Sequence, residues 1–272
     1  MIRKRSITAW VVLALFLVWS LFPIYWLLST SFKAPNQVSQ VPPVWVPSLD
    51  VSAYTTALAD PTIQTSLWHS AVVAFGATAI ALACGVLAGY ALGQLATRST
   101  DRYEFWVLTS RMAPPVAVAL PLYLMFRSTG LQDTLLGLTL AHVLLVIGIT
   151  TWILVETMRG LPRELLESAL MDGCSYTSAF RRILLPLTIP GIAGAGSIAF
   201  LLSWNEFFLS LILSDIDATT APLALYQFVG FQTLDLGQLA AASCAVLVPT
   251  ALVVLFFQKH LVTGLTMGAV KG

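Results

Sequence analysis

The stretch Leu161–Pro190, LPRELLESALMDGCSYTSAFRRILLPLTIP, is a polar and basic segment in a chain that is otherwise mostly apolar. At helical periodicity its first part has two faces. Apolar side chains fall on one arc, and charged or hydroxyl side chains fall on the opposite arc. The apolar arc holds Leu165, Leu166, Ala169 and Leu170, and the polar arc holds Arg163, Glu164, Glu167 and Ser168. The pattern predicts a short amphipathic helix.

A second short helix is expected after a turn at Gly173. Glycine commonly stands just past a helix C-terminus, and Ser175 can cap the N-terminus of the next helix. We expect Pro186 to end that helix. The product is an elbow over residues 161–186, with Met171 on the polar face of its first arm, where a flexible apolar side chain suits a partner's groove. The apolar stripe of the second arm is formed by Tyr176, Phe180, Ile183 and Leu184.

The composition is that of an integral membrane protein. The chain has 272 residues, of which 57% are hydrophobic and 10% charged, and its mean hydropathy is +0.84, whereas soluble domains carry about 25% charged residues. The net charge of +1 argues against nucleic acid as a partner. Cys84, Cys174 and Cys244 show no metal-ligand spacing, so we expect no metal and no cofactor bound by this chain.

Six stretches are long enough to cross a membrane, which takes about 20 helical residues. The predicted fold is therefore all-α, with six transmembrane helices in a single domain over residues 1–272 and the elbow between the fourth and fifth. The run after Arg3, Lys4 and Arg5 is too long for a signal peptide, and we interpret it as the first span. The spans are predicted at 7–28, 70–95, 105–127, 134–156, 189–213 and 238–258.

The basic residues predict the orientation, because Lys and Arg gather on the cytoplasmic side of membrane proteins. In a six-span topology, Lys33 and Arg127 lie on one side and Arg111 lies within a span. All the other basic residues fall on the opposite side, so both termini and the elbow are expected in the cytoplasm. These residues are Arg3, Lys4, Arg5, Arg98, Arg102, Arg159, Arg163, Arg181, Arg182, Lys259 and Lys271.

A few polar residues within the spans are candidates for a substrate pathway. Arg111 precedes Pro114 and Pro115, which must kink or unwind the third span, and it either snorkels to the near face or lines a cavity. Asn205 and Glu206 lie within the fifth span, in the stretch SWNEFFLSLIL. Glu206 is either neutral and hydrogen-bonded to a neighbouring helix or part of a polar pathway. We interpret His142 as a packing histidine.

Three further segments have alternative interpretations. Gly85, Gly89 and Gly93 have a spacing that allows close helix contact, within the chain or against a sister subunit. The nearly uncharged, proline-rich outer segment near residues 29–69 is either a loop on the membrane surface or a platform for an extracytoplasmic partner. The apolar C-terminal tail, 259–272, is expected to pack on the chain's own cytoplasmic surface or on a partner.

The motifs of several enzyme classes are absent from the sequence. It has no GxxxxGK[ST] phosphate-binding loop, no HExxH and no GxSxG. We therefore expect a protein that is not an enzyme. If it uses ATP, the nucleotide must bind to another subunit.

The elbow resembles the cytoplasmic coupling segment of permease subunits of binding-protein-dependent ABC importers. The family pattern is Glu-Ala-Ala, three residues, Gly, nine residues, Ile-x-Leu-Pro. This chain keeps every spacing, with Ser168 in place of the first Ala; the matching residues are Glu167, Ser168, Ala169, Gly173, Ile183, Leu185 and Pro186. The stretches RMAPP, LPLY, SWNEFFLSLIL and GLTMGAVKG are similar to the shorter, six-span permease of maltose-type carbohydrate importers of the bacterial plasma (inner) membrane.

The resemblance implies partners and residue roles. A second permease would complete the pathway, two cytoplasmic ATPase subunits would bind ATP and Mg²⁺, and an extracytoplasmic sugar-binding protein would deliver the substrate. Glu167 would anchor the elbow to the ATPase, Ser168 and Ala169 would keep the helix slim, and Met171 would fill the floor of the ATPase groove. Asp172 belongs to the same surface, and the tail would contact the ATPase through Thr266, Met267 and Gly268.

Three rival functions remain open from the sequence. A permease for another solute, such as a glycerol phosphate compound, shares the same motifs. A proton-coupled secondary transporter would use His142 and Glu206 as a proton relay. A membrane enzyme acting on lipid would need a catalytic cluster at one interface, and the sequence shows none.

Overall fold

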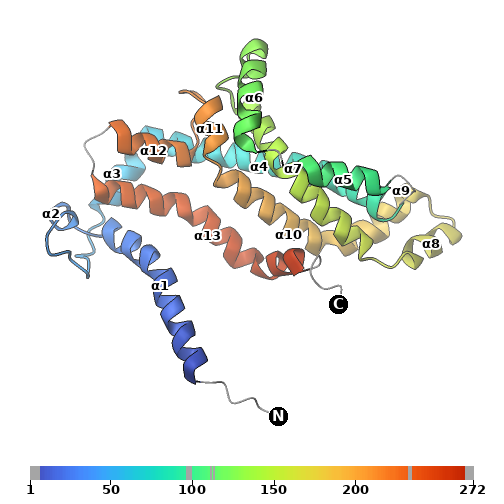
Figure 1. Cartoon of the computed structure of the whole chain (residues 1–272), viewed down its shortest axis with the longest axis horizontal. Helices are drawn as coiled ribbons and strands as arrows, with labels where there is room; N and C mark the ends of the chain where they lie inside the picture. Colours follow the sequence, from blue (N-terminus) through green and yellow to red (C-terminus); the bar gives the residue numbers. More distant parts are fainter. Residues whose placement is uncertain (1–6, 96–99, 111, 113, 232–234, 267–272) are drawn as a thin grey trace. The chain divides into compact units, whose positions relative to one another are not determined.

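The computed structural model describes residues 7–95, 100–110, 112, 114–231 and 235–266, and every regular element within them is a helix (Figure 1). The predicted all-α class is confirmed. The helices are α1 Ile7–Ser31, α2 Pro35–Val38, α3 Ser52–Ala59, α4 Pro61–Gly93, α5 Thr100–Ser110, α6 Pro115–Thr129, α7 Leu135–Arg159, α8 Glu164–Met171, α9 Tyr176–Ala179, the π-helical turn η1 Phe180–Leu184, α10 Leu185–Trp204, α11 Phe208–Leu213, α12 Ala221–Phe231 and α13 Leu236–Thr266.

The chain divides into two compact units, Met1–Gln64 with Ala224–Val248, and Thr65–Leu223 with Pro249–Gly272. In the first unit, the loop after α1 folds back along that helix. The backbone oxygen of Trp45 accepts hydrogen bonds from Tyr25 Oη at 2.5 Å and Ser29 Oγ at 3.2 Å, and the Trp45 ring lies 5.6 Å from that of Trp26. The loop that carries Trp45 is therefore held against the last turns of α1.

Five helices of the described residues are long and apolar enough to cross a membrane. They correspond to the first, second, fourth, fifth and sixth predicted spans, with shifted ends. The second begins at Pro61 rather than at residue 70. The candidate spans are Ala9–Ser31, Pro61–Gly93, Leu135–Arg159, Tyr176–Trp204 and Leu236–Lys259.

The third predicted span, 105–127, is divided into α5 and α6, and neither piece is long enough to cross a membrane by itself. Helix α6 begins at Pro115 after Pro114, whose backbone is extended, with ψ of 133°. Two consecutive prolines remove two backbone donors, and the residue before a proline is disfavoured in helical geometry. Pro121, by contrast, lies inside α6.

Two predicted boundaries differ from the structure. They are the bounds of the fifth span, 189–213, and the end of the elbow at residue 186. Pro186 does not end a helix, because the helical path runs from Tyr176 to Trp204 through η1. In a regular α-helix the ring of Pro186 would clash with the carbonyl four residues earlier. The π-helical turn directly before Pro186 widens the helix at this point. The helix instead ends at Trp204, and residues 205–207 separate it from α11.

The glycines of α4 pack within the chain. A Cβ atom at Gly89 would lie 2.9 Å from the Leu154 backbone oxygen, and one at Gly93 would lie 2.8 Å from Met158 Cβ. Gly85 faces the same helix, α7, through Leu154. The glycine stripe therefore lets α4 and α7 approach backbone to backbone, which is the intrachain alternative of the sequence prediction.

Candidate functional site

The turn of the elbow is a Schellman motif at the end of α8. Gly173 has a left-handed φ of +83°, which glycine adopts without steric cost. Its N–H donates to the Leu170 oxygen at 3.0 Å, and the N–H of Cys174 donates to the Ala169 oxygen at 3.0 Å. Ser175 Oγ then accepts the N–H of Ser178 at 3.3 Å and caps α9. The predicted turn and cap are both confirmed.

The inner face of the elbow is apolar and packs against the ends of α4 and α7. The Tyr90 ring lies 4.7 Å from the Phe180 ring, and its hydroxyl donates to the Tyr176 oxygen at 3.2 Å. The predicted apolar arc is confirmed by burial, since Leu165 and Leu170 pack on a buried cluster. That cluster contains Met158, Leu166, Ala169, Ala179, Phe180 and Leu184.

The outer face of α8, with Asp172 directly after it, is polar except at Met171, whose side chain is 88% exposed. We call this face the elbow surface; its exposed residues are Glu164, Glu167, Ser168, Met171 and Asp172. Of the other predicted coupling residues, Pro186 is exposed, whereas Ile183 and Leu185 are half-buried. Ala169 is 4% exposed and belongs to the inner face.

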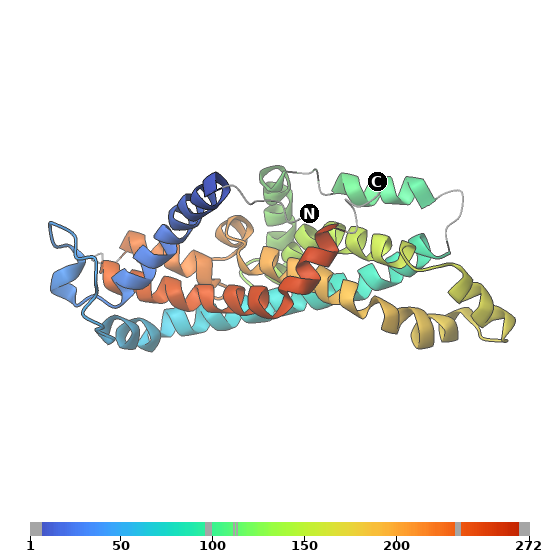
Figure 2. The same ribbon diagram turned by 90° about the horizontal axis from the view of Figure 1, so that it is seen from below.

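Gln94 ties the elbow to the long helices, a role that the sequence analysis did not identify. Its Nε2 donates to the Met158 oxygen at 2.5 Å and to the Leu161 oxygen at 3.2 Å. Met158 lies in the last turn of α7, and Leu161 lies just beyond the end of that helix. The sequence signal that could have identified this role is a glutamine directly after an apolar, glycine-rich helix. Figure 2 shows the elbow at one end of α7 and α10, which pack against each other.

A second polar site lies where α10 is interrupted. His142 of α7 is 1% exposed, and its Nδ1 lies 2.8 Å from Ser203 Oγ. Its Nε2 lies 3.6 Å from Glu206 Oε2. The Glu206 carboxylate also accepts the N–H groups of Leu209 at 3.0 Å and Ser210 at 3.3 Å, so it caps α11. His142 and Glu206, which the sequence paired only in the rival hypothesis of a proton relay, lie next to each other in the fold.

The structure describes only some of the other predicted pathway and tail residues. Asn205 is exposed, and its amide donates to Leu201 of its own helix at 2.8 Å. Arg111, Met267 and Gly268 lie outside the described residues, and Thr266 is the last residue of α13. Within the described part of the chain, no group of three His, Cys, Asp or Glu residues is arranged to hold a metal ion.

Asp133 joins the loop before α7 to the segment after α11. Its carboxylate accepts four consecutive backbone N–H groups, from Asp215 at 2.8 Å, Ile216 at 3.1 Å, Asp217 at 3.1 Å and Ala218 at 3.0 Å. Successive backbone amides that converge in this way form an anion-binding concavity. Here an acidic side chain of the same chain occupies it and fixes the connection.

Asp133→Asn is expected to lower the free energy of unfolding by about 2 kcal/mol, because hydrogen bonds to a charged acceptor are the stronger kind. Burial raises the pKa of Asp133, but the four amide donors outweigh it and leave the pKa below its usual value. This contribution is therefore present above the ordinary pKa of about 3.9 and is lost as pH falls through the folded pKa.

Denaturant unfolding of the purified protein between pH 3 and pH 7 measures this effect. The wild-type protein should lose stability below about pH 4 more steeply than Asp133→Asn, which has no charge to lose at this position. Parallel pH profiles for the two proteins would contradict the assignment.

Comparison with known proteins places the chain among transport components. A family model described as "Binding-protein-dependent transport system inner membrane component" matches residues 81–266, which include the elbow and the His142–Glu206 pair. The chain is 30% identical over 253 residues to a diacetylchitobiose uptake system permease protein of Streptomyces coelicolor, covering 92% of each chain. It is 31% identical over 273 residues to a trehalose transport system permease protein of Mycobacterium tuberculosis, covering 98% of this chain and 99% of the relative.

The fold is also that of solved transporters. A chain of a bacterial ABC transporter involved in the import of the acidic polysaccharide alginate aligns with a TM-score of 0.81 and 21% identity, over 93% of this chain and 95% of that one. A second structure, of an alginate ABC transporter in complex with a pentasaccharide-bound periplasmic protein, aligns with a TM-score of 0.70 and 15% identity, over 93% of each chain.

Proposed function

The chain belongs to the family of inner membrane components of binding-protein-dependent transport systems, and we propose that it is one of two permease subunits of an ATP-driven sugar importer. A second, dissimilar permease would complete the pathway. Two cytoplasmic ATPase subunits would bind ATP and Mg²⁺, and an extracytoplasmic binding protein would deliver the sugar or oligosaccharide. This chain would carry the transport pathway and leave ATP hydrolysis to its partners.

The elbow surface is the observation that carries this proposal. It presents carboxylates and one 88% exposed methionine on a short helix whose other face is anchored to α4 and α7. A helix held in this way moves as a rigid body with the membrane helices it contacts. Glu167 would meet a basic group of the ATPase, and Met171 would enter its groove. Gly173 would keep α8 and α9 folded against each other.

The proposal includes a six-span topology with cytoplasmic termini. Helices α5 and α6 would together form the third crossing, since the prolines between them interrupt one apolar stretch without ending it. A broken helix is tolerated at membrane depth where it is buried in protein or lines a cavity. The break would then face the pathway, together with Arg111, Asn205 and the His142–Glu206 pair.

A sugar is the favoured substrate class, because relatives of this chain are named for diacetylchitobiose and trehalose transport. Another relative, at 31% identity over 261 residues, is a sulfoquinovosyl glycerol transport system permease protein of Agrobacterium fabrum. A sugar–glycerol conjugate is therefore the second candidate class. The binding protein that cooperates with this chain would decide between them.

Uptake by proteoliposomes that contain the purified complex tests the proposed function. We expect labelled sugar to accumulate only with internal ATP and external binding protein, and to be unaffected when the proton gradient is dissipated. Uptake driven by a proton gradient without ATP would instead support a proton relay through His142 and Glu206 and would overturn the proposal.

Removal of Thr266–Gly272 is expected to impair coupling more than membrane insertion. The tail would lie against the ATPase, so its loss should reduce ATP-driven uptake several-fold while the amount of the chain in the membrane stays within about twofold. Immunoblotting of membranes alongside uptake separates the two effects. Unchanged uptake would show that the tail has no coupling role.

A further inference from the structure

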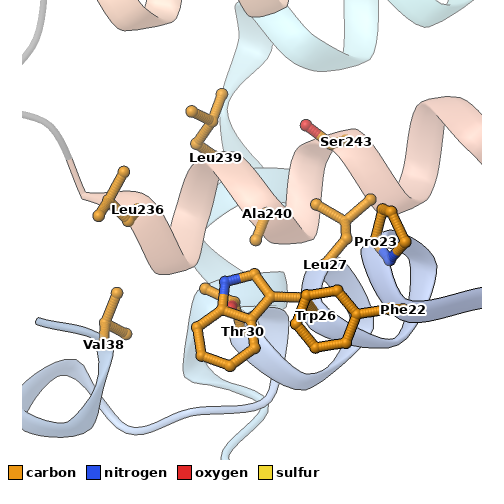
Figure 3. Close-up of a pocket in the computed structure, with 10 residues that line it drawn as sticks. All are labelled: Phe22, Pro23, Trp26, Leu27, Thr30, Val38, Leu236, Leu239, Ala240 and Ser243. Carbon is orange, nitrogen blue, oxygen red and sulfur yellow. The ribbon is translucent and has the colours of Figure 1, made fainter. Parts of the chain in front are cut away.

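An apolar groove lies between α1 and the first turns of α13, within the first compact unit (Figure 3). Its cavity measures about 540 Å³. Side chains of α1 such as Phe22 and Leu27 face Leu236 and Leu239 of α13 across it. Thr30 and Ser243 contribute hydroxyls, and the remaining lining side chains are aliphatic or aromatic. An apolar groove beside a membrane-crossing helix is chemically suited to an acyl chain.

A smaller polar cavity of about 160 Å³ adjoins the groove, because Val38 lines both. Lys33 and Asp235 line this second cavity. The Lys33 side chain is 2% exposed, and its Nζ lies 4.1 Å from the ring centroid of Trp26, which lines the groove. The charged end of Lys33 is therefore next to the apolar groove.

Lys33 has no anionic partner among the described residues, where no carboxylate lies within the 4.0 Å ion-pair distance of its Nζ. Burying an unpaired charge is costly, so such groups are normally paired. Asp235 contributes a negative charge to the same cavity. Its Oδ1 accepts the N–H groups of Gly237 at 2.9 Å and Gln238 at 3.1 Å, and no hydrogen bond to Oδ2 is made within the described part of the chain.

We propose that the groove and this cavity together bind a zwitterionic phospholipid of the phosphatidylethanolamine type. The phosphate would pair with Lys33, the ammonium of the headgroup would pair with Asp235, and an acyl chain would occupy the groove. Opposite charges at one end of an apolar channel match the order of chemical groups along such a lipid. Their place directly after α1, beside Trp26, is that of residues at a membrane interface.

Native mass spectrometry of the purified full-length protein tests this site with phosphatidylethanolamine and phosphatidylglycerol of identical acyl chains. We expect the ethanolamine lipid to bind about tenfold more tightly, a difference of about 1.4 kcal/mol. Equal affinity for the two lipids in the wild-type protein would overturn the proposal.

Two variants separate the headgroup contacts. Asp235→Asn keeps an N-cap residue at the start of α13 and should abolish the preference for ethanolamine while leaving phosphatidylglycerol binding unchanged. Lys33→Gln should weaken binding of both lipids about tenfold, and Lys33→Arg should restore it. Arg127→Gln, which removes a charge from the exposed end of α6, is the matched control and should change neither affinity. A lipid preference that survives Asp235→Asn would contradict the assignment.

A photo-crosslinking amino acid at Ser243 identifies the occupant of the groove in the membrane. We expect phospholipid adducts as the main product. Crosslinking to a protein of the complex would show that the groove is a subunit interface and would overturn the lipid assignment. This outcome is independent of ATP-driven uptake, so it leaves the proposed transport function intact.

Discussion

Glu167→Lys is expected to abolish ATP-driven uptake while the protein remains in the membrane. Glu167 is exposed on the elbow surface, and the buried side of α8 packs without it. Reversing the charge at this position should therefore leave the fold intact and place like charges together at the proposed ATPase contact. Losing one partner of a desolvated charge pair costs about 2–5 kcal/mol, so uptake should fall at least about 30-fold.

Glu164→Lys is the matched control for this variant. It makes the same charge change, one turn earlier on the same helix and also at an exposed position. Uptake should stay within a few-fold of wild type for Glu164→Lys, and only Glu167→Lys should release the ATPase subunits during purification. Similar uptake by the two variants would remove the specific role assigned to Glu167.

Gly89→Leu is expected to separate α4 from α7 and to cost at least about 3 kcal/mol of stability, the upper end of ordinary overpacking costs. Even a Cβ atom at this position would lie 2.9 Å from the Leu154 oxygen and 3.0 Å from its carbonyl carbon. Because these are backbone atoms, a change of side-chain rotamer cannot relieve the clash. Thermal unfolding in detergent measures this loss of stability, with the amount of monodisperse protein that remains as the readout.

Ala83→Leu provides the control, because it adds a comparable volume at an exposed position of the same helix. Its melting temperature should stay close to that of the wild-type protein. Gly89→Ala should lie between the two, since the neighbouring helix must move by a smaller distance. A Gly89→Leu protein as stable as Ala83→Leu would mean that the α4–α7 contact is not as close as the structure has it.

Local patterns predicted the elbow well, because its two helices are short and its signals are adjacent in sequence. The apolar arc of α8, the left-handed glycine and the serine cap each depend on residues within one or two turns. The prediction that Pro186 ends the second arm was wrong. The helix continues past this proline because the π-helical turn Phe180–Leu184 widens it directly before Pro186, and that turn could not be anticipated from composition.

The polar site at the α10 break was only half predicted. His142 and Glu206 were both candidates, but they are separated by 64 positions in the sequence, and periodicity carries no information about which helices pack together. The same holds for Asp133, whose four amide donors come from a segment more than 80 positions away. Neither arrangement has a local sequence signature.

The sequence by itself determined the membrane character, the helical class, the elbow and the family resemblance, because each follows from composition or from spacing along one segment. Only the folded structure shows that the α4 glycines face α7, that His142 lies beside Glu206, and that Lys33 lies next to an apolar groove. The physical reason is that burial and charge pairing depend on which segments meet in space. Those contacts are formed by side chains distant in the sequence, whereas periodicity records only the preference of each segment.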